Sequence, residues 1–225
     1  MFFSQNPPFL SNKHTENPSI YNIYMALRPA HIVYSMDWVI PLQNLDISKI
    51  NIKPPIQGTK LISSFNYSDD VNFTCLYILL PSLPVKSYDA ATGKLQIHLQ
   101  NTANTGKLNT FQDMLINIVH ANQDAWFPSV KNLNKDELKR GFQPLIENGS
   151  IQLYCPSSST MISNEISTYS GNTWSRGTVS TSIFSPGKVL RFLIKIQGLS
   201  FHQHQVSGMW SGKFRLQHRI SAILF

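Results

Sequence analysis

The chain has 225 residues, of which 42% are hydrophobic and 14% are charged, and its formal net charge is +7. This length can bury one good core, so we expect a single large domain, and the positive charge favours a polyanionic partner. No apolar run approaches the roughly 18 residues of a membrane-spanning helix, so we expect no membrane partner.

The first thirty residues are predicted to form an N-terminal arm. Four prolines stand there among Asn and Ser, without a sustained hydrophobic period. The opening MFFSQNPPFLSN has neither the basic start nor the apolar stretch of a secretory signal. We therefore expect a Pro- and Asn-rich arm at residues 1–30, one domain at residues 31–225, and an intracellular protein.

Strands dominate the elements predicted for the domain. The segment HIVYSMDWVIPL (31–42) is rich in β-branched and aromatic residues and is stopped by Pro41. Further strands are predicted at residues 60–65, 72–80, 94–100 and 150–155. The Ser- and Thr-rich stretch 156–185 is expected to form a long flexible loop or an irregular hairpin.

Two helices are predicted in the middle of the chain. A helical period of apolar residues begins at Phe111, where Thr110 and Asp113 resemble a capping arrangement. A second, short helix is predicted at 135–140, with Asn134 as its N-cap. The expected fold class is therefore mostly β with one or two helices.

The last forty residues predict two long strands with one apolar face and one basic face. Alternation in a strand places successive side chains on opposite faces. The apolar residues expected on the buried face of the second strand are Phe214, Leu216, Ile220 and Leu224. If the strands pair as a hairpin with both apolar faces inward, five cations form one patch: Arg191, Lys195, Lys213, Arg215 and Arg219.

The net charge of the chain is concentrated in this part. Up to Glu165, 12 basic residues balance 12 acidic ones, whereas residues 166–225 contain seven basic residues and no acidic one. Cations that follow phosphates, next to aromatic rings that stack on bases, are typical of single-strand binding. The residues expected to bind nucleic acid are Arg176, Lys188, Arg191, Lys195, Lys213, Arg215, Arg219, Trp174, Phe201 and Trp210.

No motif predicts catalysis, a metal site or a cofactor. Cys75 and Cys155 form no Cys-x-x-Cys pair and are expected to be buried free thiols. His202, His204 and His218 have no acidic residue after them in the chain and no Cys close in sequence to complete a metal site. The Gly-Lys pairs lack the spacing of a phosphate-binding loop, and no nucleophile motif occurs. We therefore expect a protein that is not an enzyme.

Two stretches resemble the OB-fold single-stranded DNA-binding proteins of large double-stranded DNA viruses. They are VYSMDWVIPL (33–42) and RFLIKIQGLSF with the following GKFRLQHRI. The resemblance implies an OB-like antiparallel β-barrel that coats single strands exposed during replication, recombination or repair, without a cofactor. It also implies a groove lined by Lys195, Lys213, Arg215, Arg219 and Trp210.

The sequence is therefore consistent with two functions. The first is a single-stranded DNA-binding protein, with RNA as an alternative ligand and with self-association along the strand. The second is a viral capsid or nucleocapsid protein with a jelly-roll β-sandwich and a basic surface facing the genome. Low charge, many short strands and a Pro-rich arm suit the second function. However, residues 1–30 contain only Lys13 and Arg28 as cations, whereas many genome-packaging coats have a basic arm.

Overall fold

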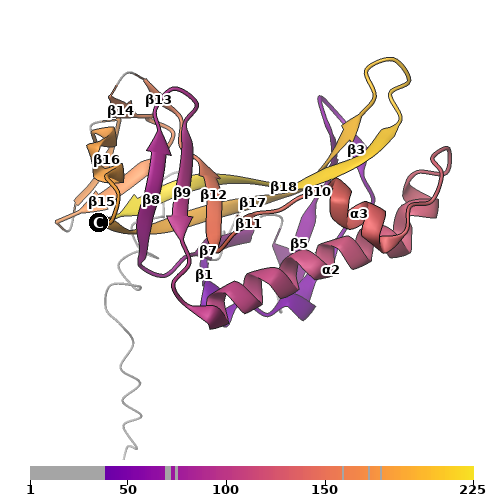
Figure 1. Ribbon diagram of the computed structural model, residues 1–225, viewed down its shortest axis with the longest axis horizontal. Helices are drawn as coiled ribbons and strands as arrows, with labels where there is room; N and C mark the ends of the chain where they lie inside the picture. The colour runs from indigo at the N-terminus through magenta and orange to yellow at the C-terminus, as the bar shows by residue number, and fades with distance from the viewer. Residues whose placement is uncertain (1–38, 69–71, 74–75, 159, 172, 178) are drawn as a thin grey trace, which may run out of the picture. The chain divides into compact units, whose positions relative to one another are not determined.

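The computed structural model describes residues 39–68, 72–73, 76–158, 160–171, 173–177 and 179–225, all within the unit Ser35–Phe225. Within these residues strands predominate and two α-helices are present, so the mostly β fold class is confirmed (Figure 1). The arm expected at 1–30 and the domain boundary after it lie outside the described residues. So does most of the strand expected at 31–42, of which β1 (Val39–Pro41) is described.

A long antiparallel hairpin of β17 (Val189–Gln203) and β18 (Trp210–Leu224) is the centre of the main sheet, as the alternation predicted. Along its free edge, β17 pairs in turn with β8 (Leu83–Asp89), β7 (Leu76–Leu79) and β4 (Leu61–Ser63). The free edge of β18 pairs with β10 (Phe142–Gln143) and β15 (Ser167–Ser170), both parallel to it.

The main sheet is open. Its longest path runs β11-β12-β9-β8-β17-β18-β15-β16, and it is not closed into a barrel as the OB resemblance implied. Several short strands pair one after another along the edges of the hairpin. In a closed barrel, by contrast, each strand pairs with the next around a cylinder. The other strands are β2 (Ile50–Ile52), β3 (Ile56–Gln57), β5 (Phe65–Ser68), β6 (Asn72–Phe73), β9 (Lys94–His98), β11 (Ile146–Glu147), β12 (Ser150–Tyr154), β13 (Ser157–Ser158), β14 (Met161–Ile162) and β16 (Thr173–Arg176).

The stretch 156–185 contains more regular structure than a flexible loop. Strands β13 and β14 pair as one antiparallel ladder, and β15 and β16 pair as another. A 3-10 helix, η3 (Thr181–Phe184), follows them and buries Phe184. Two further 3-10 helices, η1 (Leu42–Asn44) and η2 (Ile47–Lys49), follow β1. The irregular-hairpin alternative is therefore closer to the structure than the loop.

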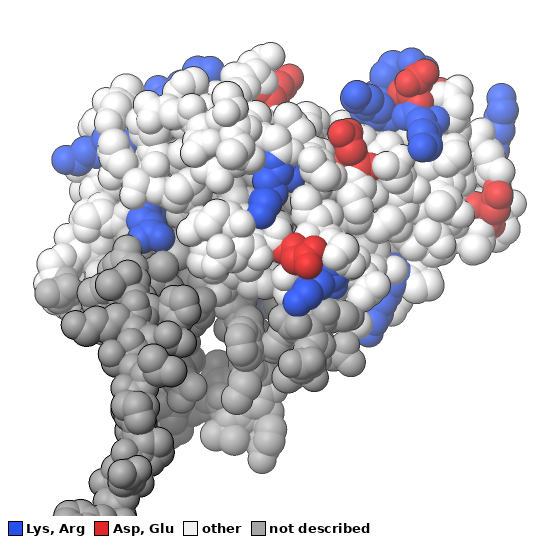
Figure 2. Space-filling view, turned by 90° about the horizontal axis from the view of Figure 1, so that it is seen from below, with Lys and Arg blue, Asp and Glu red and all other residues white. Residues whose placement is uncertain are grey.

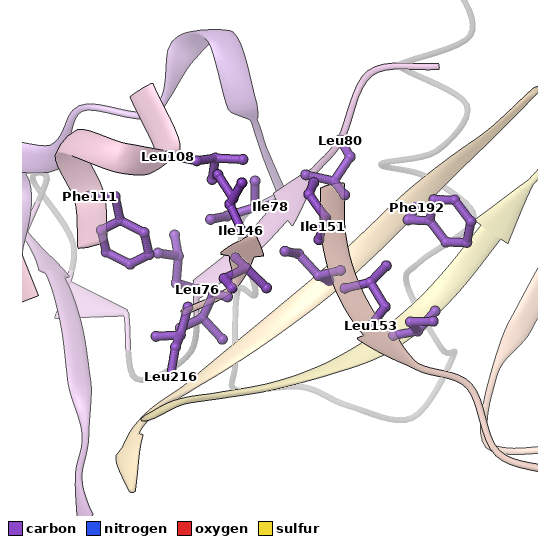
Figure 3. Close-up of a cluster of buried hydrophobic side chains, with 14 of the residues drawn as sticks. Leu76, Ile78, Leu80, Leu108, Phe111, Ile146, Ile151, Leu153, Phe192 and Leu216 are labelled. Atoms are coloured by element: carbon purple, nitrogen blue, oxygen red, sulfur yellow. The ribbon is translucent and has the colours of Figure 1, made fainter. Parts of the chain in front are cut away.

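Helix α2 (Thr102–Trp126) covers part of the core and begins nine residues before the predicted start at Phe111. The side chain of Asn101 caps it by accepting a hydrogen bond of 2.8 Å from the Ala103 N–H. The prediction missed this start because only Leu108 is buried in the early turns, so they show no apolar period. Figure 3 shows Leu108 and Phe111 of α2 in the same buried cluster as side chains of β7, β11, β12, β17 and β18.

Helix α3 (Lys135–Gly141) confirms the predicted short helix and its N-cap. The Asn134 side chain accepts from the Glu137 N–H at 2.9 Å, and the Glu137 carboxylate accepts from the Asn134 N–H at 2.8 Å. This reciprocal pair is a capping box. The helix ends at Gly141, where a Cβ atom would overlap the carbonyl oxygen of Gly212 in β18, so a residue without a side chain is required at this contact.

The described helices do not include one that is long and apolar enough to cross a membrane. Cys155 is a buried free thiol, as expected, and burial raises its pKa to about 12. The expectation for Cys75 lies outside the described residues.

Candidate nucleic-acid interface

Five strands form a sheet at one end of the hairpin, in the order β3, β4, β17, β18 and β10. Their register defines two rows of residues on opposite faces, because neighbouring residues of a strand point to opposite sides. One row consists of Gln57, Leu61, Phe201, Phe214 and Phe142. The next row consists of Ile56, Ile62, Ser200, Arg215 and Gln143.

The first row lies on the core side of this sheet and is largely aromatic. The Phe201 ring lies 5.9 Å from the Phe214 ring, and the Trp210 ring lies 4.3 Å from the ring of Phe127, just after α2. The indole N–H of Trp210 donates to the Lys213 carbonyl at 3.0 Å. Phe201 and Trp210 are each only 3% exposed, so neither ring presents a face to bases. The stacking role expected for these two residues is corrected to core packing.

The second row faces away from this core. We name this surface the open face, defined by Ile56, Ile62, Arg215 and Gln143 together with Lys60, His202, Lys213 and Arg219. Ile56 is 69% exposed, and Arg215 lies in the same cross-strand row as Ile56 and Ile62. The open face therefore combines apolar side chains of β3 and β4 with cations of β18 and of the turn between β3 and β4.

The five cations predicted to share one face of the hairpin do so by register. Lys195 lies opposite Arg219, and Arg191 lies opposite Leu224. Irregularities in the ladder after Leu193 and after Ile196 keep this face in phase along the whole hairpin. Leu224 is buried, as expected, but the irregularity near Ser221 places it opposite Arg191, on the other face from Phe214, Leu216 and Ile220.

Charged side chains are sparse on the surface, so their spacing matters. Figure 2 shows one face of the molecule, which is mostly uncharged and on which several basic side chains lie beside acidic ones. In β18, by contrast, Lys213 and Arg215 occupy alternate positions, and Arg219 follows on the same face. Same-face residues of a strand are separated by about 6.6 Å. This spacing is comparable to that of successive phosphates in an extended nucleic-acid strand.

Lys195 and Arg191 have surroundings that differ from those of the other three hairpin cations. The ammonium of Lys195 lies 5.0 Å from the centre of the Tyr77 ring. Burial lowers the pKa of the Arg191 guanidinium, and its Nε has no hydrogen-bond partner in the described part of the chain. Arg191 lies ten residues before Phe201, about 33 Å along an extended strand. It is therefore remote from the part of the open face around Arg215, and Arg219, which lies opposite Lys195, is the member of the open face nearest to it.

Three other predicted residues are also separate from the open face. Lys188 is exposed in the turn before β17. Arg176 in β16 donates to the Ser167 hydroxyl at 3.1 Å, and Trp174 pairs with Tyr169 in the backbone register. In Figure 1, β15 and β16 lie at one end of the hairpin and β3 lies at the other. The predicted residues therefore do not form one continuous site.

Sequence reasoning missed two basic residues at the open face. Lys60 lies in the turn between β3 and β4, and His202 follows Phe201 in β17. Burial and the nearby charges of Arg215, Lys213 and Lys60 lower the pKa of His202. The composition of the chain does indicate a second basic segment, because residues 47–68, like residues 166–225, contain no Asp or Glu.

His218 belongs to the core side of the hairpin and is separate from His202. One ring nitrogen lies 3.0 Å from the Leu216 carbonyl oxygen, and the other lies 3.3 Å from the Gln152 carbonyl oxygen. Burial is the largest cause and lowers the pKa of His218, and it outweighs the two carbonyl oxygens, which favour the protonated ring. Among the described residues, no group of three potential ligands that could hold a metal ion occurs.

This buried histidine predicts that the protein loses stability in mild acid. The unfolded chain binds a proton at the ordinary His pKa of 6.5, but the folded chain does so only at lower pH. The free energy of unfolding should therefore fall as pH decreases through 6.5, by at most about 1.4 kcal/mol per pH unit for this group. Urea unfolding at pH 7.5, 6.5 and 5.5 measures it.

The matched variants are His218→Gln and His204→Gln. His218→Gln should reduce the pH dependence, with a remainder from His202, whose lowered pKa acts in the same direction. His204 is exposed in the hairpin turn, so His204→Gln should keep the native dependence. Equal pH dependence in the native chain and His218→Gln would contradict the assignment.

A cleft of about 450 Å³ lies elsewhere, between α2, α3 and the segment that follows α3. Its lining includes Gln112, Asp113 and Lys139. The side-chain oxygen of Gln112 accepts hydrogen bonds from the N–H groups of Leu145 (2.6 Å) and Ile146 (3.1 Å). Gln112 therefore holds this segment against α2.

Comparison with known proteins finds no matching family model, no matching curated protein and no matching solved structure.

Proposed function

We propose that the chain binds single-stranded nucleic acid on the open face, without chemically altering it. The observation that supports this most is the row of cations along β18, next to Lys60 and His202, in two chain segments without acidic residues. Such a row suits one phosphate backbone, because Lys213 and Arg215 lie at a spacing similar to that of successive phosphates and Arg219 follows at about twice that spacing.

The apolar part of the open face favours a single strand over a duplex. Ile56 and Ile62 lie in the same cross-strand row as Arg215, so a strand whose phosphates meet Arg215 brings its bases or sugars over them. In a duplex the base faces are stacked inside and cannot reach these side chains. OB-fold proteins also hold single strands on the face of a sheet, and the proposal needs this face rather than a closed barrel.

The proposed role is to coat single strands exposed inside the cell during replication, recombination or repair. DNA is the ligand we propose, and RNA is the alternative. The open face reads the phosphate backbone and offers no helix to a duplex groove, so little sequence preference is expected.

The test is the salt dependence of binding to single-stranded DNA. Four phosphate contacts, from Lys60, Lys213, Arg215 and Arg219, give an expected slope of log K against log salt of about −2.8, at roughly 0.7 per contact. Fluorescence anisotropy with a labelled oligonucleotide measures the slope, and competition with duplex of the same sequence measures the preference. An affinity independent of salt, or a preference for duplex, would contradict the proposal.

Light scattering of the same samples separates the coat-protein alternative. A strand-coating protein should form small complexes whose mass rises with oligonucleotide length, at roughly 4–16 nucleotides per binding unit. Closed particles that assemble without nucleic acid would support the alternative, because shell proteins assemble through repeated symmetric contacts.

A further inference from the structure

The turn between β17 and β18 is held by specific hydrogen bonds. The His204 N–H donates to the Met209 carbonyl at 2.8 Å, and the Gly208 N–H donates to the His204 carbonyl at 2.9 Å. The Gln203 side chain donates to the Gly208 carbonyl at 2.6 Å and to the Gln57 side-chain oxygen in β3 at 2.9 Å. The tip of the hairpin is therefore fastened both to itself and to β3.

Two apolar side chains occupy this fastened tip. Val206 is 102% exposed and Met209 is 44% exposed. Turns usually contain Gly, Pro, Asn, Asp or Ser, each of which suits the backbone geometry or the solvent. Single exposed apolar residues are common on protein surfaces, and here two lie three positions apart in one short turn of a sparsely charged protein.

The surroundings of the tip are basic. Lys60, Lys213 and Arg215 all act on His202, which lies just before the turn, and no acidic residue occurs in either hairpin. The partner that fits is therefore an anion that also offers an apolar surface. A nucleic-acid strand provides both, in its phosphates and its base faces.

The small apolar area of the tip favours bases over a lipid bilayer. Attachment to a membrane strengthens with the apolar area that is buried, and Val206 and Met209 offer little. A gap between two neighbouring bases, in contrast, accepts one or two side chains, and Met and other aliphatic side chains act as such wedges in nucleic-acid-binding proteins.

We propose that Val206 and Met209 form an apolar wedge that enters between neighbouring bases of the strand bound on the open face. This inference rests on the proposed function and extends it, because the tip contacts bases while the cations contact phosphates. The wedge separates stacked bases and sets the direction in which the strand leaves the open face.

The test uses a single-stranded DNA oligonucleotide that contains 2-aminopurine, whose fluorescence rises when the base is unstacked. The native chain should raise this fluorescence on binding. The variant Val206→Ser/Met209→Ser should lose most of the rise and bind about tenfold more weakly, the effect of losing one base contact of ordinary strength. The control is Val189→Ser, at the other end of the hairpin, where the native side chain is 57% exposed.

The outcomes separate the two proposals. If the native chain does not bind the oligonucleotide, both the proposed function and the wedge fail. If it binds but the tip variant unstacks 2-aminopurine as the native chain does, the wedge alone is wrong. Loss of binding to phosphatidylserine vesicles, with oligonucleotide binding unchanged, would assign the tip to lipid and overturn the wedge. Thermal melting of the tip variant should match the native chain, because both side chains are exposed.

Discussion

Replacement of Arg215 and Arg219 together by Gln is expected to lower the affinity for single-stranded DNA about a hundredfold at low salt, because a hydrogen bond to a charged group contributes roughly 1.5 kcal/mol or more. The slope of log K against log salt should become shallower by about 1.4, at roughly 0.7 per contact. Arg219 is exposed and Arg215 is half-buried on the open face, so the fold should persist. Anisotropy titrations at several salt concentrations measure both effects.

The matched control removes the same charge elsewhere. Lys94 in β9 and Lys139 in α3 are exposed, and neither lies in the five-stranded sheet. Lys94→Gln/Lys139→Gln should weaken binding only through the lower net charge, by much less than the arginine pair. Equal losses in the two double variants would show that binding responds to the total charge of the chain and not to the open face. Circular dichroism confirms that both variants are folded.

The hairpin could be predicted from the sequence because its signal is local. Alternation of apolar and charged residues over fifteen positions specifies two strands, their buried face and their pairing. The same alternation failed at Leu224, where an irregularity in the ladder shifts the phase. It also left Phe201 without a clear face, because the strand is irregular between Ile196 and Gly198. A glycine inside a strand is the sequence signal for such a bulge.

The open face could be predicted only in part because it depends on pairings between distant segments. Lys60 joins His202 and Arg215 only after β4 pairs with β17. Burial of Trp210 likewise depends on Phe127, which lies 83 positions earlier in the chain. Local alternation contains no information about either contact. The absence of acidic residues identifies 47–68 and 166–225 as basic segments. It does not show that the two segments lie side by side in the folded protein.

The contact between β4 and β17 depends on one glycine, and we expect Gly198→Ala to destabilise the protein by about 3–5 kcal/mol. Gly198 has a φ of +145°, which residues with a side chain rarely adopt. A Cβ atom there would also overlap the carbonyl oxygen of Ser63 in β4, so the two strands would have to separate. Separation would also remove Lys60 and Ile62 from the open face. Urea unfolding measures the stability, and anisotropy measures binding by the molecules that remain folded.

Gly187→Ala is the control that separates backbone strain from this overlap. Gly187 also has a positive φ, of +83°, but no atom lies within 4 Å of the position where its Cβ would be. Gly187→Ala should therefore lower the free energy of unfolding only by the backbone strain, about 1–2 kcal/mol, and leave DNA binding unchanged. The difference between the two variants measures how tightly β4 is held against β17. Suppose that Gly198→Ala lowers the free energy of unfolding no more than Gly187→Ala and binds DNA as well as the native chain. The pairing of β4 with β17 would then not be required for binding, and Lys60 and Ile62 would not belong to the binding surface.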